Sequence, residues 1–220
     1  MGKYHSTIPV LFALFLLASL AACSSSPNKL NDTGKTQSST TQEAKTEATQ
    51  YETGRNAFQK LYVAARAFAA DAKPYRLESA YTEGAPVGQG KAGIWSAQFA
   101  SASRRAIKAY TWSGLSGEDV PARGISRGTE DTYNPANTST QVFDVAFLKI
   151  DSDAAFTEAQ KHGGDKLMKK DPKQPVFFSL DFSPRKSELV WHVIYGTNRN
   201  DAKLRVAVNA TTGKYIATEH

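Results

Sequence analysis

One short segment has the residue types and spacing of a serine-hydrolase nucleophile. Residues 124–128 read G-I-S-R-G and match the pattern G-x-S-x-G, in which a strained strand-to-helix turn presents the serine to a substrate. The accompanying base would have to be His192 or His162. However, Pro121 precedes the segment and no helical periodicity follows it, so a glycine-rich loop is the preferred interpretation. An envelope serine hydrolase that uses Ser126 is the less favoured alternative.

The other motifs do not fit phosphate, metal or cofactor sites. Residues 84–91 are rich in glycine, but the glycine spacing and the Ala92 after Lys91 do not fit a Walker A loop. The run 151–153 (D-S-D) lacks the later glycine and glutamate of a calcium loop and is typical of a helix cap. A single cysteine excludes a cysteine-rich zinc or iron–sulfur site. We therefore expect no metal, no cofactor and no enzymatic activity.

That single cysteine lies directly after a predicted export signal. Residues 8–20 are apolar but too short to span a bilayer, which is typical of the core of a signal peptide. The run 20–23 (L-A-A-C) resembles a bacterial lipobox. The resemblance implies cleavage between Ala22 and Cys23 and attachment of acyl chains such as palmitate to Cys23. We expect an exported protein, anchored by lipid to the bacterial membrane and facing the periplasm from the outer membrane if the cell has two. The alternative is an ordinary secretory signal.

Residues 23–50 follow the predicted signal peptide 1–22. Serine, threonine, glutamine, asparagine, lysine and glutamate dominate this stretch, and few of its residues are apolar. Such a composition cannot bury enough apolar surface to fold. It predicts a flexible tether that holds the rest of the chain a short distance from the membrane.

Residues 51–114 have the composition of a folded domain. Thr53 is placed to cap a helix that runs to about Ala72, with its apolar residues on one face and Pro74 beyond its end. Alternating polar and apolar residues then predict strands. These are Tyr75–Thr82, Ile94–Ala100 and Arg105–Trp112.

Residues 142–220 follow a similar plan. They begin with a predicted strand over 142–150, followed by a helix that Asp151 caps and that falters at Gly163 and Gly164. His192 lies on the polar face of a later strand without a recognisable carboxylate partner, which favours a structural role. The predicted strands after the helix are Val176–Phe182, Leu189–Tyr195, Lys203–Asn209 and Tyr215–Ala217.

Landmark residues recur between these two segments. Ala57 and Phe58 are matched 98 positions later by Ala155 and Phe156, and Pro74 is matched at the same offset by Pro172. Further matches pair Trp95 with Trp191, Phe99 with Tyr195 and the Gly114 turn with the Gly213 turn. The pattern indicates a tandem duplication. We predict an α+β fold of two similar halves, each a helix packed on an antiparallel β-sheet; the alternative is coincidence among aromatic-rich strands.

The second half also resembles a known family. Residues 148–155 (L-K-I-D-S-D-A-A) lead into the helix, and residues 206–214 (V-A-V-N-A-T-T-G-K) end in a Thr-Gly turn. This order resembles the PepSY domain family, whose usual Asp is replaced here by Asn209. The resemblance implies a helix packed on an antiparallel sheet, an exported or membrane-attached location, and a role in binding partners or restraining proteases without catalytic residues. A degenerate first copy would make the chain a lipoprotein with tandem PepSY-like domains.

The segment 115–141 shows no clear periodicity and is expected to be an inter-repeat loop. A loop of this length is often functional, and Arg123, Arg127 and Tyr133 make it a predicted binding loop, with a plain linker as the alternative. The net charge of +6 without a dense basic tract excludes a nucleic-acid-binding protein. We expect a non-enzymatic protein-binding or regulatory lipoprotein with an envelope protein as partner. The alternative is a structural lipoprotein that binds peptidoglycan or anionic glycans of the wall.

Overall fold

The computed structural model describes residues 48–86 and 89–219, which all belong to one compact unit, Lys45–His220. The predicted signal peptide, its cleavage site at Ala22, the lipidation residue Cys23 and the tether up to residue 47 lie outside the described residues. Within the described part, no helix is long and apolar enough to cross a membrane.

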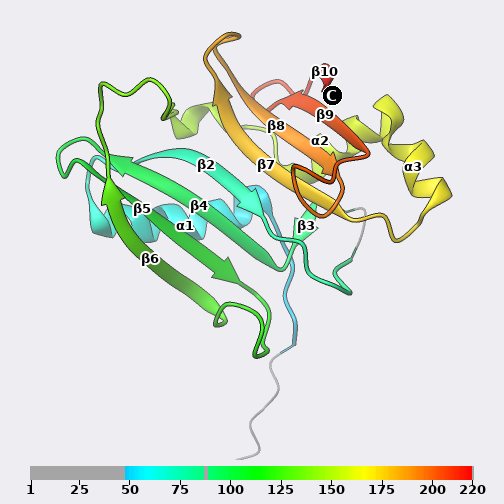
Figure 1. Ribbon diagram of the computed structural model, residues 1–220, viewed down its shortest axis with the longest axis horizontal. Helices are drawn as coiled ribbons and strands as arrows, with labels where there is room; N and C mark the ends of the chain where they lie inside the picture. Colours follow the sequence, from blue (N-terminus) through cyan, green and yellow to red (C-terminus); the bar gives the residue numbers. More distant parts are fainter. Residues whose placement is uncertain (1–47, 87–88, 220) are drawn as a thin grey trace, which may run out of the picture. The chain divides into compact units, whose positions relative to one another are not determined.

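A large antiparallel sheet forms the body of this unit (Figure 1). Within the described residues its strand order is β10-β9-β8-β7-β2-β4-β5-β6. The predicted α+β class is confirmed, and most predicted strands are found within a few residues. The strands are β2 (Lys73–Ser79), β4 (Ile94–Ser101), β5 (Ala106–Ser113), β6 (Gly124–Thr132), β7 (Val176–Ser183), β8 (Glu188–Tyr195), β9 (Leu204–Asn209) and β10 (Tyr215–Glu219). A separate small ribbon pairs β1 (Glu52–Thr53) with β3 (Lys91–Ala92).

Two helices cover one face of the sheet. Helix α1 (Gly54–Phe68) packs on β2, β4 and β5, behind which it lies in Figure 1, and α2 (Ser152–Ala159) packs on β8 and β9. Because side chains alternate along a strand, only one face of each strand meets the helices. That face carries the apolar core, in which Trp95, Leu180 and Trp191 are fully buried. The opposite face, called here the helix-free face, carries polar residues together with apolar ones such as Val190 and Ile194.

The second helical segment is interrupted at the expected place. A π-helical turn (Gln160–Gly164) separates α2 from α3 (Asp165–Lys170), and Gly163 there has a φ of 109°. Glycine tolerates this left-handed conformation without a steric penalty, so the predicted break at Gly163 and Gly164 is confirmed. Helix α1 ends at Phe68, a few residues before the predicted end, because Ala69 already has an extended backbone.

Two sequence predictions are wrong. Residues 142–150 do not form a strand but contain a short 3-10 turn, η1 (Val145–Phe147), because the Asp144 side chain accepts a hydrogen bond from the Ala146 amide and holds the backbone in a turn. Residues 115–141 are not without regular structure, since β6 lies within them and pairs with β5. Residues 124–128, interpreted from the sequence as a glycine-rich loop, are the first part of this strand. Strand β6 is an edge strand exposed over most of its length, so it carries no hydrophobic alternation to predict it.

Corresponding landmarks of the two segments make matching contacts. The indole nitrogen of Trp95 donates to the carbonyl of Glu52 at 2.9 Å, and that of Trp191 donates to the carbonyl of Ile150 at 2.9 Å. The two indole rings meet edge to face with centroids 6.3 Å apart. Each indole thus ties a core strand to a residue two positions before the start of a helix.

Candidate functional site

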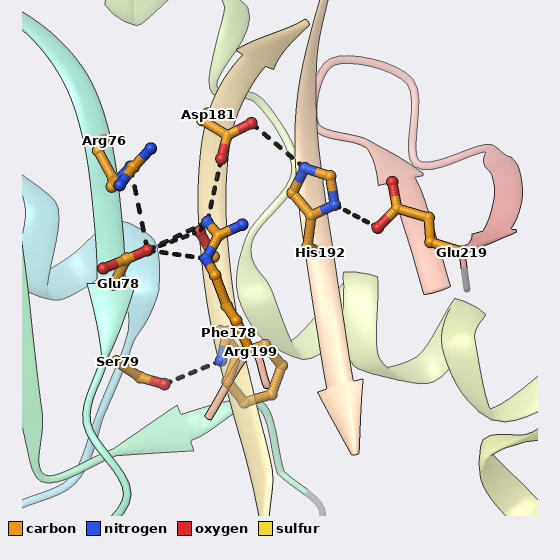
Figure 2. Close-up of polar contacts among 9 residues, drawn as sticks. Arg76, Glu78, Ser79, Phe178, Asp181, His192, Arg199 and Glu219 are labelled. Carbon is orange, nitrogen blue, oxygen red and sulfur yellow. Dashed lines mark hydrogen bonds and ion pairs between the residues drawn. The ribbon is translucent and has the colours of Figure 1, made fainter. Parts of the chain in front are cut away.

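Polar and charged side chains from β2, β7, β8 and β10 gather on the helix-free face (Figure 2). In β8, Trp191 and Val193 point into the core, so His192 between them points to the helix-free face. Neighbouring strands supply carboxylates on the same face. We call this set the polar row: Glu78, Ser179, Asp181, His192, Arg199 and Glu219.

His192 is held between two carboxylates. Its Nδ1 lies 2.8 Å from Glu219 Oε2, and its Nε2 lies 3.3 Å from Asp181 Oδ1. An ionised carboxylate only accepts hydrogen bonds, so both ring nitrogens must donate and the ring is an imidazolium. Burial alone would lower the pKa of His192, but the hydrogen bonds and charges of Asp181 and Glu219 outweigh burial and raise it to about 9.

The pKa values of the two carboxylates shift in the opposite direction, below their usual range. Burial would raise the pKa of Asp181, yet the hydrogen bonds and charges of His192 and Arg199 hold it below its usual range. The hydrogen bond from His192 likewise holds the pKa of Glu219 below its usual range. At neutral pH the three groups therefore form a charged cluster that links β7, β8 and β10.

Arg199 extends the row to the centre of the sheet. It comes from the β8–β9 connection, and its Nη2 donates to Glu78 Oε1 at 3.0 Å and to Asp181 Oδ2 at 3.1 Å, as well as to the Ser179 hydroxyl. Its Nε also donates to Glu78 Oε1, at 3.2 Å. One guanidinium thus connects β2 with β7, and Asp181 has both oxygens engaged, one by Arg199 and one by His192.

Two depressions open on either side of Asp181. We call them together the polar trough. The smaller has a volume of about 340 Å³ and lies over the His192 end of the row. The larger has a volume of about 560 Å³ and extends over β2 and β4. The smaller is lined by Asp181, His192, Ile194, Arg199, Arg205 and Glu219; the larger by Tyr75, Arg76, Gln98, 138–141, Asp181, Phe182 and Pro184.

The chemistry of the row suits binding better than proton transfer. A general base must be unprotonated near the working pH, whereas His192 carries its proton well above neutrality. Fixed charges with mutually satisfied hydrogen bonds instead offer a rigid polar surface. Among the residues described, no group of three or more His, Cys, Asp or Glu side chains is placed to hold a metal ion.

The structure does not bring the proposed hydrolase residues together. Ser126 lies on edge strand β6 opposite Thr111, and four strands separate β6 from the β8 residue His192, roughly 24 Å at the usual strand spacing. His162 lies in the π-helical turn, where it stacks on Tyr215 with ring centroids 3.6 Å apart.

The predicted binding-loop residues lie around β6 and outside the polar trough. Arg123 donates to the carbonyls of Gly114, at 3.0 Å, and Ala48, at 2.8 Å. Arg127 is exposed on β6. Tyr133, which follows β6, is buried with 6% of its surface exposed, so its ring is a packing group.

The sequence favoured a structural role for His192 and did not identify its partners Asp181 and Glu219. The available signal was the alternation in β7 and β8, which places Asp181 and His192 on the polar face of two consecutive strands. The β7–β8 register pairs His192 with Ser179, next to Asp181 on the same face. Glu219 could not be found in this way, because its approach depends on the order of β8, β9 and β10 in the sheet.

Comparisons with known proteins give a fold and no family. No protein-family model matches the chain, and no curated protein does, so the resemblance to PepSY domains stays a prediction. A solved structure with a similar fold is that of a candidate lipoprotein from Clostridium difficile 630. It matches with a TM-score of 0.50 at 9% sequence identity, over 74% of this chain and 91% of that one. The similarity shows a shared fold.

Proposed function

We propose that this protein is a lipid-anchored, non-enzymatic binding protein of the bacterial envelope, and that it binds its partner through the helix-free face of the sheet. The lipobox-like residues 20–23 support the anchor. The fold shared with a candidate lipoprotein agrees with it. The partner is another component of the envelope, a protein or a wall polymer.

The observation that carries this proposal is the polar trough. Its charged groups are already fixed by one another, so a ligand meets a surface that needs little reorganisation. Its two depressions are open and polar, which suits a hydrophilic partner. The protonated state of His192 supports binding rather than general-base catalysis.

We also infer that the chain is a tandem duplication whose halves meet at β2 and β7. The matching contacts of Trp95 and Trp191 support this inference, as does the pairing of each half's first long strand at the sheet centre. The ring contacts Phe58–Phe99 and Phe156–Tyr195, with centroids 6.0 Å and 6.3 Å apart, extend the match. The trough then straddles the junction, a common position for ligand sites. On this view the second half is a PepSY-like unit and the first a diverged copy.

A photocrosslinking experiment in intact cells tests the proposal. A photoreactive residue at Gln98, in the trough, is compared with one at Val63, which is 72% exposed on the outer side of α1. We expect a specific adduct with an envelope component from Gln98 and none from Val63. The adduct should be lost when Cys23→Ala removes the anchor. Adducts from Val63 alone, or equally from both positions, would contradict the helix-free face as the binding surface.

A further inference from the structure

Arg76 is left out of the polar row, although it is adjacent to it. Arg76 on β2 is the register partner of Asp181 on β7 and of Gln98 on β4. The Asp181 oxygens accept from His192 and Arg199, and among the described residues no hydrogen bond joins Asp181 to Arg76. Its nearest carboxylate is Glu78, whose Oε1 lies 3.9 Å from Arg76 Nε and already accepts from Arg199 (Figure 2).

The guanidinium of Arg76 therefore has unused donors. Among the described residues, its Nε is buried and has no hydrogen-bond partner. The side chain is still 43% exposed and lines the larger depression, which gives a ligand access to it.

The walls around Arg76 have the chemistry of a sugar-binding site. Tyr75 supplies a ring surface, and Gln98 and Gln141 supply side-chain amides. Hydroxyls come from Thr138, Ser139 and Thr140. Aromatic rings pack against the C–H face of a pyranose, while amides and hydroxyls donate to and accept from its hydroxyl groups. The volume of about 560 Å³ is sufficient for a small oligosaccharide unit.

The charge around the depression favours an anionic ligand. The single carboxylate in its lining, Asp181, is neutralised by His192 and Arg199, and the nearby Glu78 is shared between Arg199 and Arg76. The β7–β8 turn, which begins at the lining residue Pro184, continues with the exposed Arg185 and Lys186. A planar guanidinium binds a carboxylate or a phosphate through two parallel hydrogen bonds.

We propose that the larger depression of the polar trough binds an anionic glycan, with Arg76 holding the carboxylate or phosphate of a sugar whose ring contacts Tyr75 and the side-chain amides. This inference rests on the proposed function and names the chemistry of the partner at that site. A protein ligand on this face is the competing outcome of the test.

The test is a titration of the ¹⁵N-labelled compact unit, residues 45–220, monitored by backbone amide shifts. The probes are glucose, glucuronate and glucose 6-phosphate, which share a ring and differ in charge, together with acetate and a hyaluronan tetrasaccharide. We expect glucuronate or glucose 6-phosphate to shift the amides of Tyr75, Gln98 and Gln141, glucose to bind more weakly, and acetate to have no effect at these sites. Whichever anionic sugar binds more tightly identifies the anionic group.

Matched variants separate recognition from general charge. Arg76→Gln should weaken binding of the anionic sugar about tenfold, whereas Arg66→Gln, which removes an exposed arginine on α1, should leave it unchanged. Equal losses in both variants, or equal binding of glucose and glucuronate, would overturn the inference. So would the absence of shifts with every sugar, including the tetrasaccharide. If Gln98 still crosslinks to an envelope protein in that case, the proposed function survives and only the glycan inference fails.

Discussion

Thr53 and Asp151 lie 98 positions apart in the chain, yet the Thr53 hydroxyl donates a hydrogen bond to Asp151 Oδ2 at 2.7 Å. The other oxygen of Asp151 accepts from the backbone amides of Arg55, at 2.8 Å, and Ser152, at 2.7 Å. Thr53 was predicted to cap α1, but the side chain of Asp151 does so instead. One carboxylate therefore satisfies amides in the first turns of both α1 and α2.

Replacing Asp151 should destabilise both helix starts at once. We expect Asp151→Ala to lower the free energy of unfolding by about 2–3 kcal/mol, because it removes one cap from each of two helices. Urea denaturation monitored by circular dichroism measures this loss. Asp165→Ala is the control, since it removes only an exposed i,i+4 ion pair and should cost less than about 0.5 kcal/mol. Equal losses in the two variants would show that Asp151 caps neither helix to any useful extent.

Gly54 is required by packing rather than by backbone conformation. A Cβ at this position would lie 2.6 Å from Trp191 Cη2 and 2.9 Å from Trp95 Cη2. Alanine normally favours a helix over glycine, but here we expect Gly54→Ala to destabilise the fold by about 1–3 kcal/mol, because the rigid indole rings must move. Thermal unfolding and the near-ultraviolet tryptophan signal report both effects. Gly117→Ala is the matched control, since its Cβ would make an ordinary 3.5 Å contact with Val120. A stable Gly54→Ala protein with an unchanged tryptophan signal would refute the packing argument.

Hydrophobic periodicity predicted the parts of the fold that bury one face. Strand β8 alternates Leu189, Trp191 and Val193 into the core, so its position was evident. Hydrophobic periodicity did not predict β6, because this strand is almost wholly exposed. It also gave the wrong structure for residues 142–150, where Phe143 is buried in the core but Phe147 is 47% exposed. In that segment the apolar residues alternate, yet the side chain of Asp144 specifies a turn.

The candidate site was less predictable because its contacts cross strands that are distant in sequence. Asp181 and His192 belong to one hairpin, and their meeting follows from its register. Arg199 reaches Glu78 from 121 positions away, and only the sheet order places β2 beside β7. Long-range pairing of this kind leaves no signal in a single sequence.

Glu219 should hold the last strand against the sheet. Strand β10 is a short edge strand, and the Glu219–His192 hydrogen bond of 2.8 Å joins it to β8 across β9. We expect Glu219→Gln to speed amide hydrogen exchange in β10 by about tenfold, because the bond to His192 loses the negative charge of its acceptor and becomes weaker. Exchange in β6, the opposite edge, is the internal control and should not change. Faster exchange throughout the sheet, or in neither edge, would contradict a local role.

Because His192 is protonated in the folded protein, the free energy of unfolding should fall as the pH rises above neutrality. Its pKa is raised in the folded protein from the ordinary 6.5 to about 9. A group whose pKa rises on folding contributes stability that is fully present below about 6.5 and is lost as the pH rises through about 9. We expect the wild-type protein to lose on the order of 2–3 kcal/mol across this interval from His192.

His192→Gln cannot carry the charge and should flatten this part of the pH profile. Urea denaturation of both proteins at several pH values between 6 and 10 measures the difference, and NMR titration of the His192 ring locates the pKa directly. Parallel profiles for the two proteins, or a ring that titrates near 6.5, would show that Asp181 and Glu219 do not hold His192 as an imidazolium.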